Sequence, residues 1–554
     1  MSSNWEELAA DKRKRLAKTI PQQWRMREVP GSDPVIDYPR TAEILSKREL
    51  EITELSATQL VSKLASNGLS AVEVTLAFCK RAAIAQQLTN CLHEFFPEAA
   101  LAQAKELDQY FAKHGKPVSP LHGLPVSLKD QLRGYETSMG YISWLFQYDK
   151  EDSLLTHLLR KASAVFYVKT SVPQTLLVCE TVNNIIGATT NPRNRNLSCG
   201  GSSGGEGALL AMRGSVLGVG TDIGGSIRVP AAFNFLYGLR PSHGRLPYAK
   251  MANSMEGQET VHSVVGPMGH SVEDLRLFVQ AVLEQEPWKF DCNVIPMPWR
   301  QSEADTVRAK IQSGGLTIGV YNFDGNVLPH PPILRGIEIA VDALNRDGHK
   351  VVPWKPYKHN HGSELMNRIW AADASKDVLE DINASSEPII PNIQPLINPS
   401  AQPVGINELW VIQTERWAYR NEYLEKWREA EDQLGTELDA IIAPVAPTAA
   451  VRHGRFMYYG YSFLINLLDF TSVVVPVGFA DAGIDRRNQA YVWVSELDKA
   501  VQEEYDPQAY HGAPVAVQVI GRRLGEEKTL AVAEELANSL GRKEAVSLVL
   551  ISRL

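Results

Sequence analysis

Apolar positions along the chain recur with two different periods. Two segments with helical spacing, 55–68 and 69–88, each open with a serine that is followed three residues later by Gln59 or Glu73. This spacing is typical of a capped helix start, so we expect two neighbouring helices near the N-terminus. Short apolar runs rich in Val, Ile and Ala predict strands at 164–169, 438–444, 470–477 and 513–521.

Strand and helix patterns also follow each other directly. Residues 316–354 consist of a short apolar run, an amphipathic stretch of helical period and a second short apolar run, which predicts a βαβ unit. A further helix is expected near 153–161 and another over 526–541. The chain therefore reads as an α/β protein with a mixed sheet.

One predicted strand carries a charged residue. The stretch GLPVSLKDQ, residues 123–131, alternates so that Val126 and Leu128 face one side while Ser127 and Lys129 face the other. A lysine on a strand is most often a solvated surface residue. Here Lys129 shares the polar side of the strand with Ser127, which makes Lys129 a candidate catalytic residue.

The pattern predicts one large domain rather than several. We expect residues 1–50 to form a helical N-terminal extension and residues 51–554 to form the main domain. The Pro- and Asn-rich segment 385–403 and the charged helix that follows it suggest a peripheral insertion at about 355–435.

Composition narrows the class of protein. With 44% hydrophobic and 22% charged residues and a formal net charge of -8, the chain resembles a soluble globular protein and not a nucleic-acid binder. No apolar run is long enough for a membrane helix. The five scattered cysteines favour a reducing compartment, so we expect a cytoplasmic protein. The terminal Ser552-Arg553-Leu554 resembles a peroxisomal address, but a frayed helix end is the favoured interpretation and the peroxisomal address is the alternative.

Two glycine-rich loops lie close together in the sequence: SCGGSSGGEGA at 198–208 and TDIGGSIRVPAAFNF at 221–235. Neither has the lysine of a phosphate-binding P-loop. Gly200–Gly204 fits the G-x-S-x-G nucleophile elbow, which would make Ser202 the nucleophile. The elbow needs a buried strand before the serine, whereas the preceding TTNPRNRNLSC reads as a polar loop.

Taken as a pair, the loops indicate acyl transfer. Glycine pairs let several backbone N–H groups point the same way and form an oxyanion hole, with Ser226 at its end. Ser202 is placed to relay a proton from Ser226 to a lysine, provided that the lysine is neutral. Lys129 is the candidate, and a neutral lysine must be buried and weakly paired.

The motifs GLPVSLKD, CGGSSGGEGALL and GVGTDIGGSIRVPA, in this order, resemble the amidase signature family, and within it the fungal acetamidases. The resemblance implies a large mixed β-sheet covered by helices on both faces, with the core motifs at 121–245. It implies Ser226 as nucleophile, Ser202 on a cis peptide as the bridge, and Lys129 as base. It also implies an oxyanion hole from the N–H groups of Ile223, Gly224, Gly225 and Ser226, with Leu176 beside the substrate. Supporting contacts are expected from Ser203, Thr221, Asp222 and Arg228.

We therefore expect an amidohydrolase that cleaves small, acetamide-like carboxamides to carboxylate and ammonia, with no metal or cofactor. Its partners are the amide and water, with no nucleic acid and no membrane, and a homodimer is left open. The alternatives are an amidase-signature hydrolase of fatty-acid amides, aryl amides or carbamate esters, an amidotransferase-type subunit, and a binding protein that keeps the fold without activity.

Overall fold

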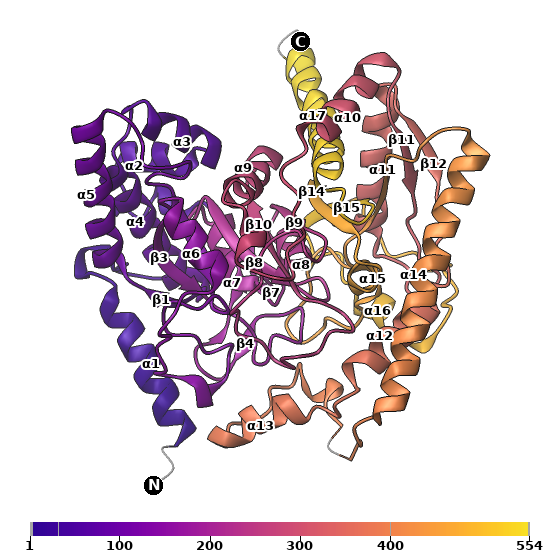
Figure 1. Cartoon of the computed structure of the whole chain (residues 1–554), viewed down its shortest axis with the longest axis horizontal. Coiled ribbons are helices and arrows are strands. Elements are labelled where there is room, and N and C mark those ends of the chain that lie inside the picture. Colours follow the sequence, from indigo (N-terminus) through magenta and orange to yellow (C-terminus); the bar gives the residue numbers. More distant parts are fainter. Residues whose placement is uncertain (1–3, 32, 399, 552–554) are drawn as a thin grey trace.

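The fold is built on one broad twisted sheet. In the computed structural model, residues 4–31, 33–398 and 400–551 are described, and within them eleven strands form a single sheet (Figure 1). Their order across the sheet is β1 (Leu92–Phe95), β3 (Val165–Thr170), β2 (Pro125–Lys129), β8 (Leu217–Asp222), β10 (Val264–Gly269), β9 (Tyr237–Arg240), β14 (Thr471–Phe479), β15 (Pro514–Gly521), β13 (Ala440–Pro444), β11 (Thr317–Val320) and β12 (Lys350–Pro353).

The sheet is mixed, as predicted. Strand β2 pairs in parallel with β3 and β8, and β11 pairs in parallel with β12 and β13. The β14–β15 and β8–β10 pairs are antiparallel. Two short hairpins lie outside the main sheet: β4 (Val182–Asn183) with β5 (Gly187–Ala188), and β6 (Thr190–Asn191) with β7 (Asn194–Ser198).

Helices cover both faces of the sheet, which confirms the expected architecture. Along β14, Val473 and Val475 belong to one hydrophobic cluster, whereas Val474 belongs to a second cluster on the opposite side. This alternation follows from the two-residue period of a strand. The first cluster contains residues of α4 (Ala71–Thr89), α9 (Val272–Leu283), α11 (Pro331–Arg346) and α17 (Glu526–Ile551), and the second contains residues of α8 (Arg228–Phe233).

The capped helices agree with the sequence patterns, and so does the βαβ unit, which consists of β11, α11 and β12 with the two strands parallel. Helix α3 (Ala57–Ala65) begins with a complete capping box between Ser56 and Gln59, and Ser70 caps α4. Helix α6 (Leu154–Lys161) is capped by Ser153. The other α-helices between residues 47 and 313 are α2 (Lys47–Glu54), α5 (Pro97–His114), α7 (Gly204–Ala211) and α10 (Gln301–Ser313).

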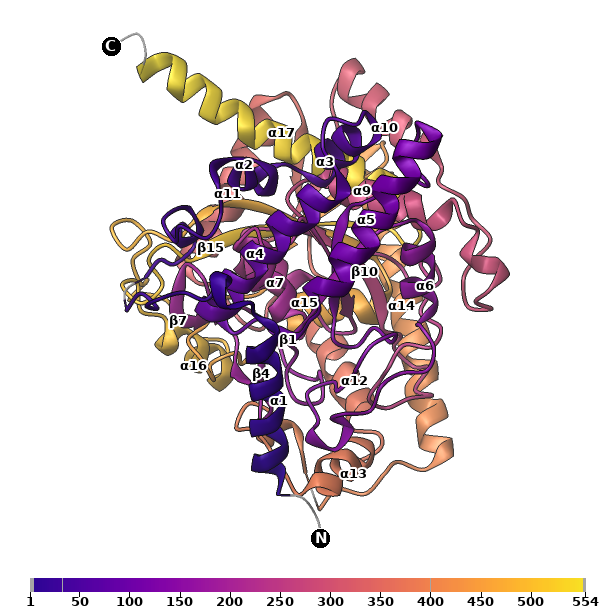
Figure 2. The ribbon, with the colours of Figure 1, turned by 90° about the vertical axis from the view of Figure 1, so that its left-hand side faces the viewer.

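The N-terminal segment is attached to the body of the protein by buried charges. Helix α1 (Trp5–Thr19) contacts β1, which lies beside one end of it in Figure 2, and it also contacts the short helix η3 (Ile142–Trp144). Its Lys12 side chain is buried and forms ion pairs with Glu94 and Glu136. The expected separation of residues 1–50 as an extension stays a prediction.

The segment predicted as an insertion at 355–435 lies against the rest of the chain. It contains α12 (His359–Trp370), α13 (Lys376–Ser385), η5 (Gln394–Leu396) and α14 (Ile406–Leu434), and α12 packs on α15 (Gly460–Leu468). The stretch 385–403 differs from a simple surface excursion, because Ile390 and Ile393 are buried in a cluster with Val178. Among the described residues, no helix is long and apolar enough to cross a membrane. Ser552-Arg553-Leu554 lie outside the described residues.

Candidate active site

Lys129 occupies the end of a central strand. Strand β2 lies between β3 and β8, so the Lys129 side chain is fully buried. Its Nζ lies 2.8 Å from Ser202 Oγ and 2.6 Å from Thr221 Oγ1. The predicted alternation also holds, since Val126 and Leu128 join the large hydrophobic cluster while Lys129 faces the polar side.

The hydrogen bonds around Thr221 fix which atoms donate. Gln131 Nε2 donates to the carbonyl of Ala252 at 2.6 Å, and a carbonyl can only accept. The Gln131 amide oxygen therefore faces Thr221, whose hydroxyl donates to it at 2.6 Å. Because the Thr221 hydroxyl proton is already donated to Gln131, the Thr221 oxygen can only accept a hydrogen bond from Lys129. A neutral Lys129 then keeps its lone pair for the Ser202 hydroxyl.

Ser202 lies on a tight glycine turn that leads into α7. The Gly201–Ser202 peptide bond is cis, as the resemblance implied. A Cβ at Gly201 would approach the backbone of Val178 and Glu180 to less than 3 Å, so only glycine fits. The preceding segment, expected as a polar loop, includes the β6–β7 hairpin, which ends at Ser198 and is separate from the main sheet.

The second glycine loop runs from the end of β8 to α8 and carries Ser226. Ser226 is 5% exposed, and its carbonyl accepts from the Ser203 amide at 3.2 Å, which joins the two loops. Ser203 Oγ also accepts from the Thr221 amide at 3.4 Å. The Ser226 hydroxyl makes no hydrogen bond to any of the residues that the structure describes.

The Asp222 carboxylate holds the same loop in place through hydrogen bonds and an ion pair. Its carboxylate accepts from the amides of Gly225 at 2.9 Å and Ile227 at 3.1 Å, and it forms a two-pronged ion pair with Arg228. Burial acts to raise the pKa of Asp222, but the Arg228 charge and the hydrogen bond from Asn466 outweigh it and hold that pKa well below the usual range.

Arg228 connects this loop to the other half of the sheet. Its guanidinium donates to the side-chain oxygen of Asn466 on α15 at 2.6 Å and to that of Gln518 on β15 at 3.2 Å. The side chains of Asp222 and Arg228 are fully buried. The conformation of the loop therefore depends on residues almost 300 positions apart in the sequence.

Burial lets a large share of the Lys129 amine lose its proton at physiological pH. Desolvation lowers the pKa of Lys129 to about 7, against the opposing pull of Asp222 and Glu206. Glu206, on α7, is buried too, and desolvation raises the pKa of its carboxyl to about 8. Because a protonated Glu206 carries no negative charge, its pull towards the charged form of Lys129 is weak at neutral pH.

The two serines open into one small cavity of about 30 Å³. Ser202, Ser226, Thr221, Ile223 and Leu176 all line it. A cavity that holds one water needs about 10–15 Å³, so the space suits a ligand of only a few heavy atoms.

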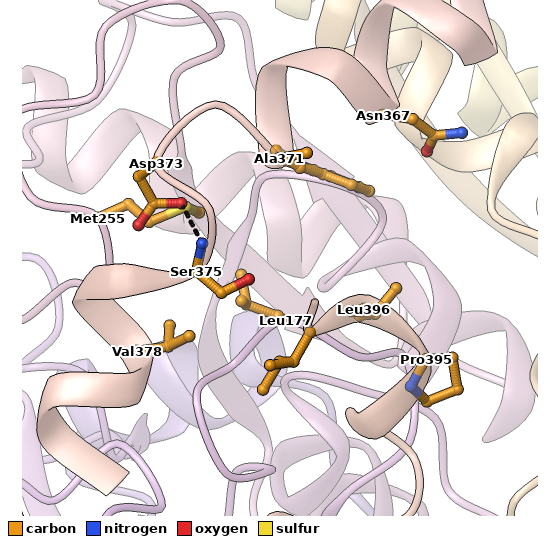
Figure 3. A pocket seen from close by; sticks show the side chains of 11 residues that line it. Leu177, Met255, Asn367, Ala371, Asp373, Ser375, Val378, Pro395 and Leu396 are labelled. Atoms are coloured by element: carbon orange, nitrogen blue, oxygen red, sulfur yellow. Dashed lines mark hydrogen bonds between the residues drawn. The ribbon is translucent and has the colours of Figure 1, made fainter. Parts of the chain in front are cut away.

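A larger pocket of about 320 Å³ adjoins the inner cavity, and Leu177 and Met255 line both. Its outer wall comes from α12, α13 and η5 and includes Trp370. Val378 and Leu396 lie on the same wall (Figure 3). The insertion predicted at 355–435 thus contributes to the approach to Ser226. We refer to Leu177 and Met255, the two residues shared by both linings, as the neck.

The structure brings most of the predicted site residues together. Lys129, Ser202 and Ser226 converge, but the Gly225 amide is occupied by Asp222. Sequence reasoning missed Gln131, Glu206 and Asn466. Gln131 follows Lys129 by two residues and Glu206 sits inside the glycine motif, so proximity to the motifs is the signal that could have found them. No cluster of His, Cys, Asp or Glu in the described part of the chain is arranged to hold a metal ion.

Comparisons with known proteins agree with this geometry. A family profile described as Amidase matches residues 73–530. The chain is 72% identical over 543 residues to an acetamidase of Emericella nidulans, covering 98% of this chain and 99% of that protein. It is 64% identical to an acetamidase of Aspergillus oryzae, with 98% and 99% covered. The structure of a fatty acid amide hydrolase matches with a TM-score of 0.91 and 34% identity, over 97% of this chain and 95% of that one.

Proposed function

Because the chain belongs to the amidase signature family and is an amidase, we propose that it hydrolyses short aliphatic carboxamides through an acyl-enzyme on Ser226. The observation that carries the proposal is the 2.8 Å contact between Lys129 Nζ and Ser202 Oγ, together with the small cavity that Ser202 and Ser226 both line. The likeness to two fungal acetamidases supports the substrate class.

In the proposed reaction, Ser226 Oγ attacks the carbonyl carbon of R–CO–NH2. Its proton passes to Ser202, and the Ser202 proton passes to the neutral Lys129. The negative oxygen is held by the amides of Ile223, Gly224 and Ser226, because the Gly225 amide already donates to Asp222.

The intermediate then collapses as the C–N bond breaks. Lys129 returns its proton through Ser202 to the nitrogen, which leaves as ammonia, and an ester remains on Ser226. Water attacks this ester and its proton passes through Ser202 to Lys129. The bond between the acyl carbon and Ser226 Oγ then breaks, Lys129 returns the proton through Ser202 to Ser226 Oγ, and the carboxylate is released. One amide and one water give one carboxylate and one ammonium ion, so no redox partner is needed.

The inner cavity supports a short acyl group. At about 30 Å³ it is less than a tenth of the volume of the outer pocket, at about 320 Å³. An acetyl group fits such a space, whereas a longer chain has to pass the neck at Leu177 and Met255. Fatty-acid amides, aryl amides and carbamate esters are therefore the weaker candidates, although the outer pocket keeps larger substrates as the alternative.

Ammonia release from amides of increasing chain length tests the substrate class. We expect kcat/KM to be highest for acetamide or propionamide and to fall steadily towards hexanamide. A preference for hexanamide or oleamide would replace the proposal with the larger-substrate alternative.

Labelling with a fluorophosphonate tests the nucleophile and separates an enzyme from a binding protein. Ser226→Ala should lose labelling and amide hydrolysis together, because it removes the atom that forms the acyl-enzyme. If Ser226→Ala kept the label while Ser202→Ala lost it, the nucleophile elbow at Ser202 would be correct.

The cellular context completes the proposal. We place the enzyme in the cytoplasm, acting alone or as a homodimer rather than as an amidotransferase subunit. The five cysteines are unpaired, which suits a reducing compartment. A fluorescent fusion with and without Ser552-Arg553-Leu554 distinguishes this from a peroxisomal location, and sedimentation gives the oligomeric state.

A further inference from the structure

Helix α15 lies against the loop that carries Ser226, and it presents a polar face to that loop. Ser462 and Asn466 are four residues apart on this helix, so they lie on the same face. Both side chains are buried, at 1% and 2% exposure. The residues between them include 463–465, which belong to a hydrophobic cluster. Buried polar side chains need hydrogen-bond partners, and the loop at 222–226 provides them.

Ser462 reaches the middle of this loop. Its Oγ donates to the Gly224 carbonyl at 2.7 Å, and it also lies 3.0 Å from the carbonyl of Tyr459, which caps the start of α15. A hydroxyl has a single proton, and the shorter of the two contacts is the one to Gly224. A Cβ at Gly225 would lie 2.6 Å from Ser462 Oγ, so only glycine at this position lets the loop and the helix approach so closely.

The peptide unit between Gly224 and Gly225 is held from both sides. Its carbonyl, on Gly224, accepts from Ser462. Its N–H, on Gly225, donates to the Asp222 carboxylate at 2.9 Å. The carbonyl and the N–H of a trans peptide point in opposite directions. This one peptide unit therefore bridges α15 and the Asp222 side chain.

The same peptide unit is the one in the loop that rotates most easily. Rotation of a peptide unit changes ψ of the residue before it and φ of the residue after it. Here both residues are glycines, which lack the Cβ that restricts these angles. Within the described part of the chain, the flanking amides of Gly224 and Ser226 make no hydrogen bond. They are two of the donors assigned to the oxyanion hole, so their directions depend on how firmly the Gly224–Gly225 unit is held.

The neighbouring peptide units are held by their carbonyls too. Asn466 Nδ2 donates to the Asp222 carbonyl at 3.2 Å. The Val229 amide, on α8, donates to the Gly225 carbonyl at 2.7 Å. In each unit the carbonyl is bound on the side away from its own N–H, which leaves the N–H available to a substrate.

We propose that Ser462 is a positioning residue for the oxyanion hole. By holding the Gly224 carbonyl on the α15 side, it keeps the Gly224 and Ser226 amides directed at the substrate oxygen that becomes negative. Donors that are oriented in advance stabilise such a charge without having to reorganise during the reaction. The role rests on the proposed function, because it presupposes that Ser226 attacks the amide carbonyl.

Ser462→Ala tests this role, since the substitution removes one hydroxyl and adds no bulk. Loss of a whole oxyanion donor costs about 10²–10³ in kcat, and loosening of the donors should cost less. We expect kcat for acetamide to fall at least about tenfold while KM stays within about threefold, because acetamide binds before its oxygen becomes charged.

Ser363→Ala is the matched control. Ser363 Oγ donates to the His359 carbonyl at 3.0 Å within α12, the helix that packs on α15. The control thus loses the same kind of hydrogen bond from a neighbouring helix, and its kcat should stay within about twofold of the wild type.

Inhibition by trifluoroacetone separates positioning from damage to the fold. Ser226 Oγ adds to the ketone carbon, the carbonyl π electrons move to the oxygen, and the serine proton passes through Ser202 to Lys129. The adduct therefore places a negative oxygen in the oxyanion hole. We expect Ki in Ser462→Ala to rise by about the factor by which kcat falls. A partly unfolded variant would instead lose kcat through fewer active molecules, with an unchanged Ki.

The outcomes distinguish this role from the proposed function. Unchanged kcat in Ser462→Ala, an equal loss in Ser363→Ala, or an unchanged Ki would overturn the positioning role alone, provided that Ser226→Ala is inactive. If Ser226→Ala still hydrolysed acetamide and trifluoroacetone did not inhibit the wild type, the proposed function itself would fail.

Discussion

At the scale of single residues, the charge on Lys129 controls the proposed reaction. Burial lowers the pKa of Lys129 to about 7, and only the neutral amine can accept the Ser202 proton. We therefore expect kcat/KM for acetamide to rise about tenfold per pH unit below pH 7 and to level off above it. The measurement is a pH–rate profile from pH 5 to 9. A flat profile across pH 7 would mean that Lys129 does not act as the base.

Gln131 is a positioning residue in this scheme. It holds the Thr221 hydroxyl as an acceptor for Lys129. In Gln131→Met, the Thr221 proton can turn towards the Lys129 lone pair, which competes with Ser202 and favours the neutral amine. We expect kcat to fall about tenfold or more, with the acidic limb of the pH profile moved to lower pH.

The direction of that shift separates positioning from general damage to the fold. A merely destabilised protein would lose kcat without moving the limb, and Thr221→Ser, which keeps the hydroxyl, serves as the control. A limb that stayed in place or moved to higher pH would contradict the assigned hydrogen-bond directions.

The sequence predicted Lys129, Ser202 and Ser226 because their spacing is distinctive, but not the contacts that orient them. Gln131 and Asn466 act through hydrogen-bond directions that only the folded chain defines. The resemblance also implied an oxyanion hole made of four backbone amides, at residues 223–226. The carboxylate of Asp222 takes one of them, a competition that the sequence alone cannot reveal.

At the scale of elements, the neck between the two pockets sets the expected chain-length preference. Leu177→Ala combined with Met255→Ala should join the inner cavity to the outer pocket. Each buried methylene is worth about 0.8 kcal/mol, so the ratio of kcat/KM for hexanamide to that for acetamide should rise at least about tenfold. The measurement is ammonia release from both amides.

A change deeper in the outer pocket provides the comparison. Val378 lines the outer pocket but not the inner cavity, so Val378→Ala should leave the ratio within about twofold. If both variants shifted the ratio equally, the outer pocket as a whole, and not the neck, would determine chain length.

Strand β8 illustrates why some elements could not be predicted. Its sequence LGVGTD contains two glycines, which weaken a strand pattern. In the structure, a Cβ at Gly218 would collide with Glu206 and one at Gly220 would press on Ser203. These glycines let α7 and the serine loop before it approach the sheet. The same glycines that weaken the strand pattern in the sequence therefore allow the site to form.

At the scale of the whole molecule, the N-terminal helix is held to the body by a buried ion pair. Lys12 is 2% exposed and pairs with Glu94 and Glu136. Removing one partner of a buried pair leaves uncompensated charge and typically costs about 3–5 kcal/mol. Because Glu94 is 23% exposed, we expect Lys12→Ala to lower the free energy of unfolding by about 3 kcal/mol at most.

Denaturant unfolding at neutral pH measures this effect. Lys14→Ala is the control, since Lys14 is exposed on the same helix and should change stability by less than about 0.5 kcal/mol. If Lys12→Ala proved equally mild, α1 would be a loosely attached extension, in line with the boundary expected at residue 50.

The contact between Arg228 and Gln518 has a consequence for the synthesis of this protein. Asp222 and Arg228 leave the ribosome long before α15 and β15, and the partners of Arg228 come from Asn466 and from Gln518, near the end of the chain. A nascent chain that already contains Lys129, Ser202 and Ser226 is therefore still without the contacts that hold the Ser226 loop through Arg228. Under the proposed mechanism, we therefore expect activity only when translation is almost complete, and we expect shortened products of an interrupted message to contain the serines but to be inactive.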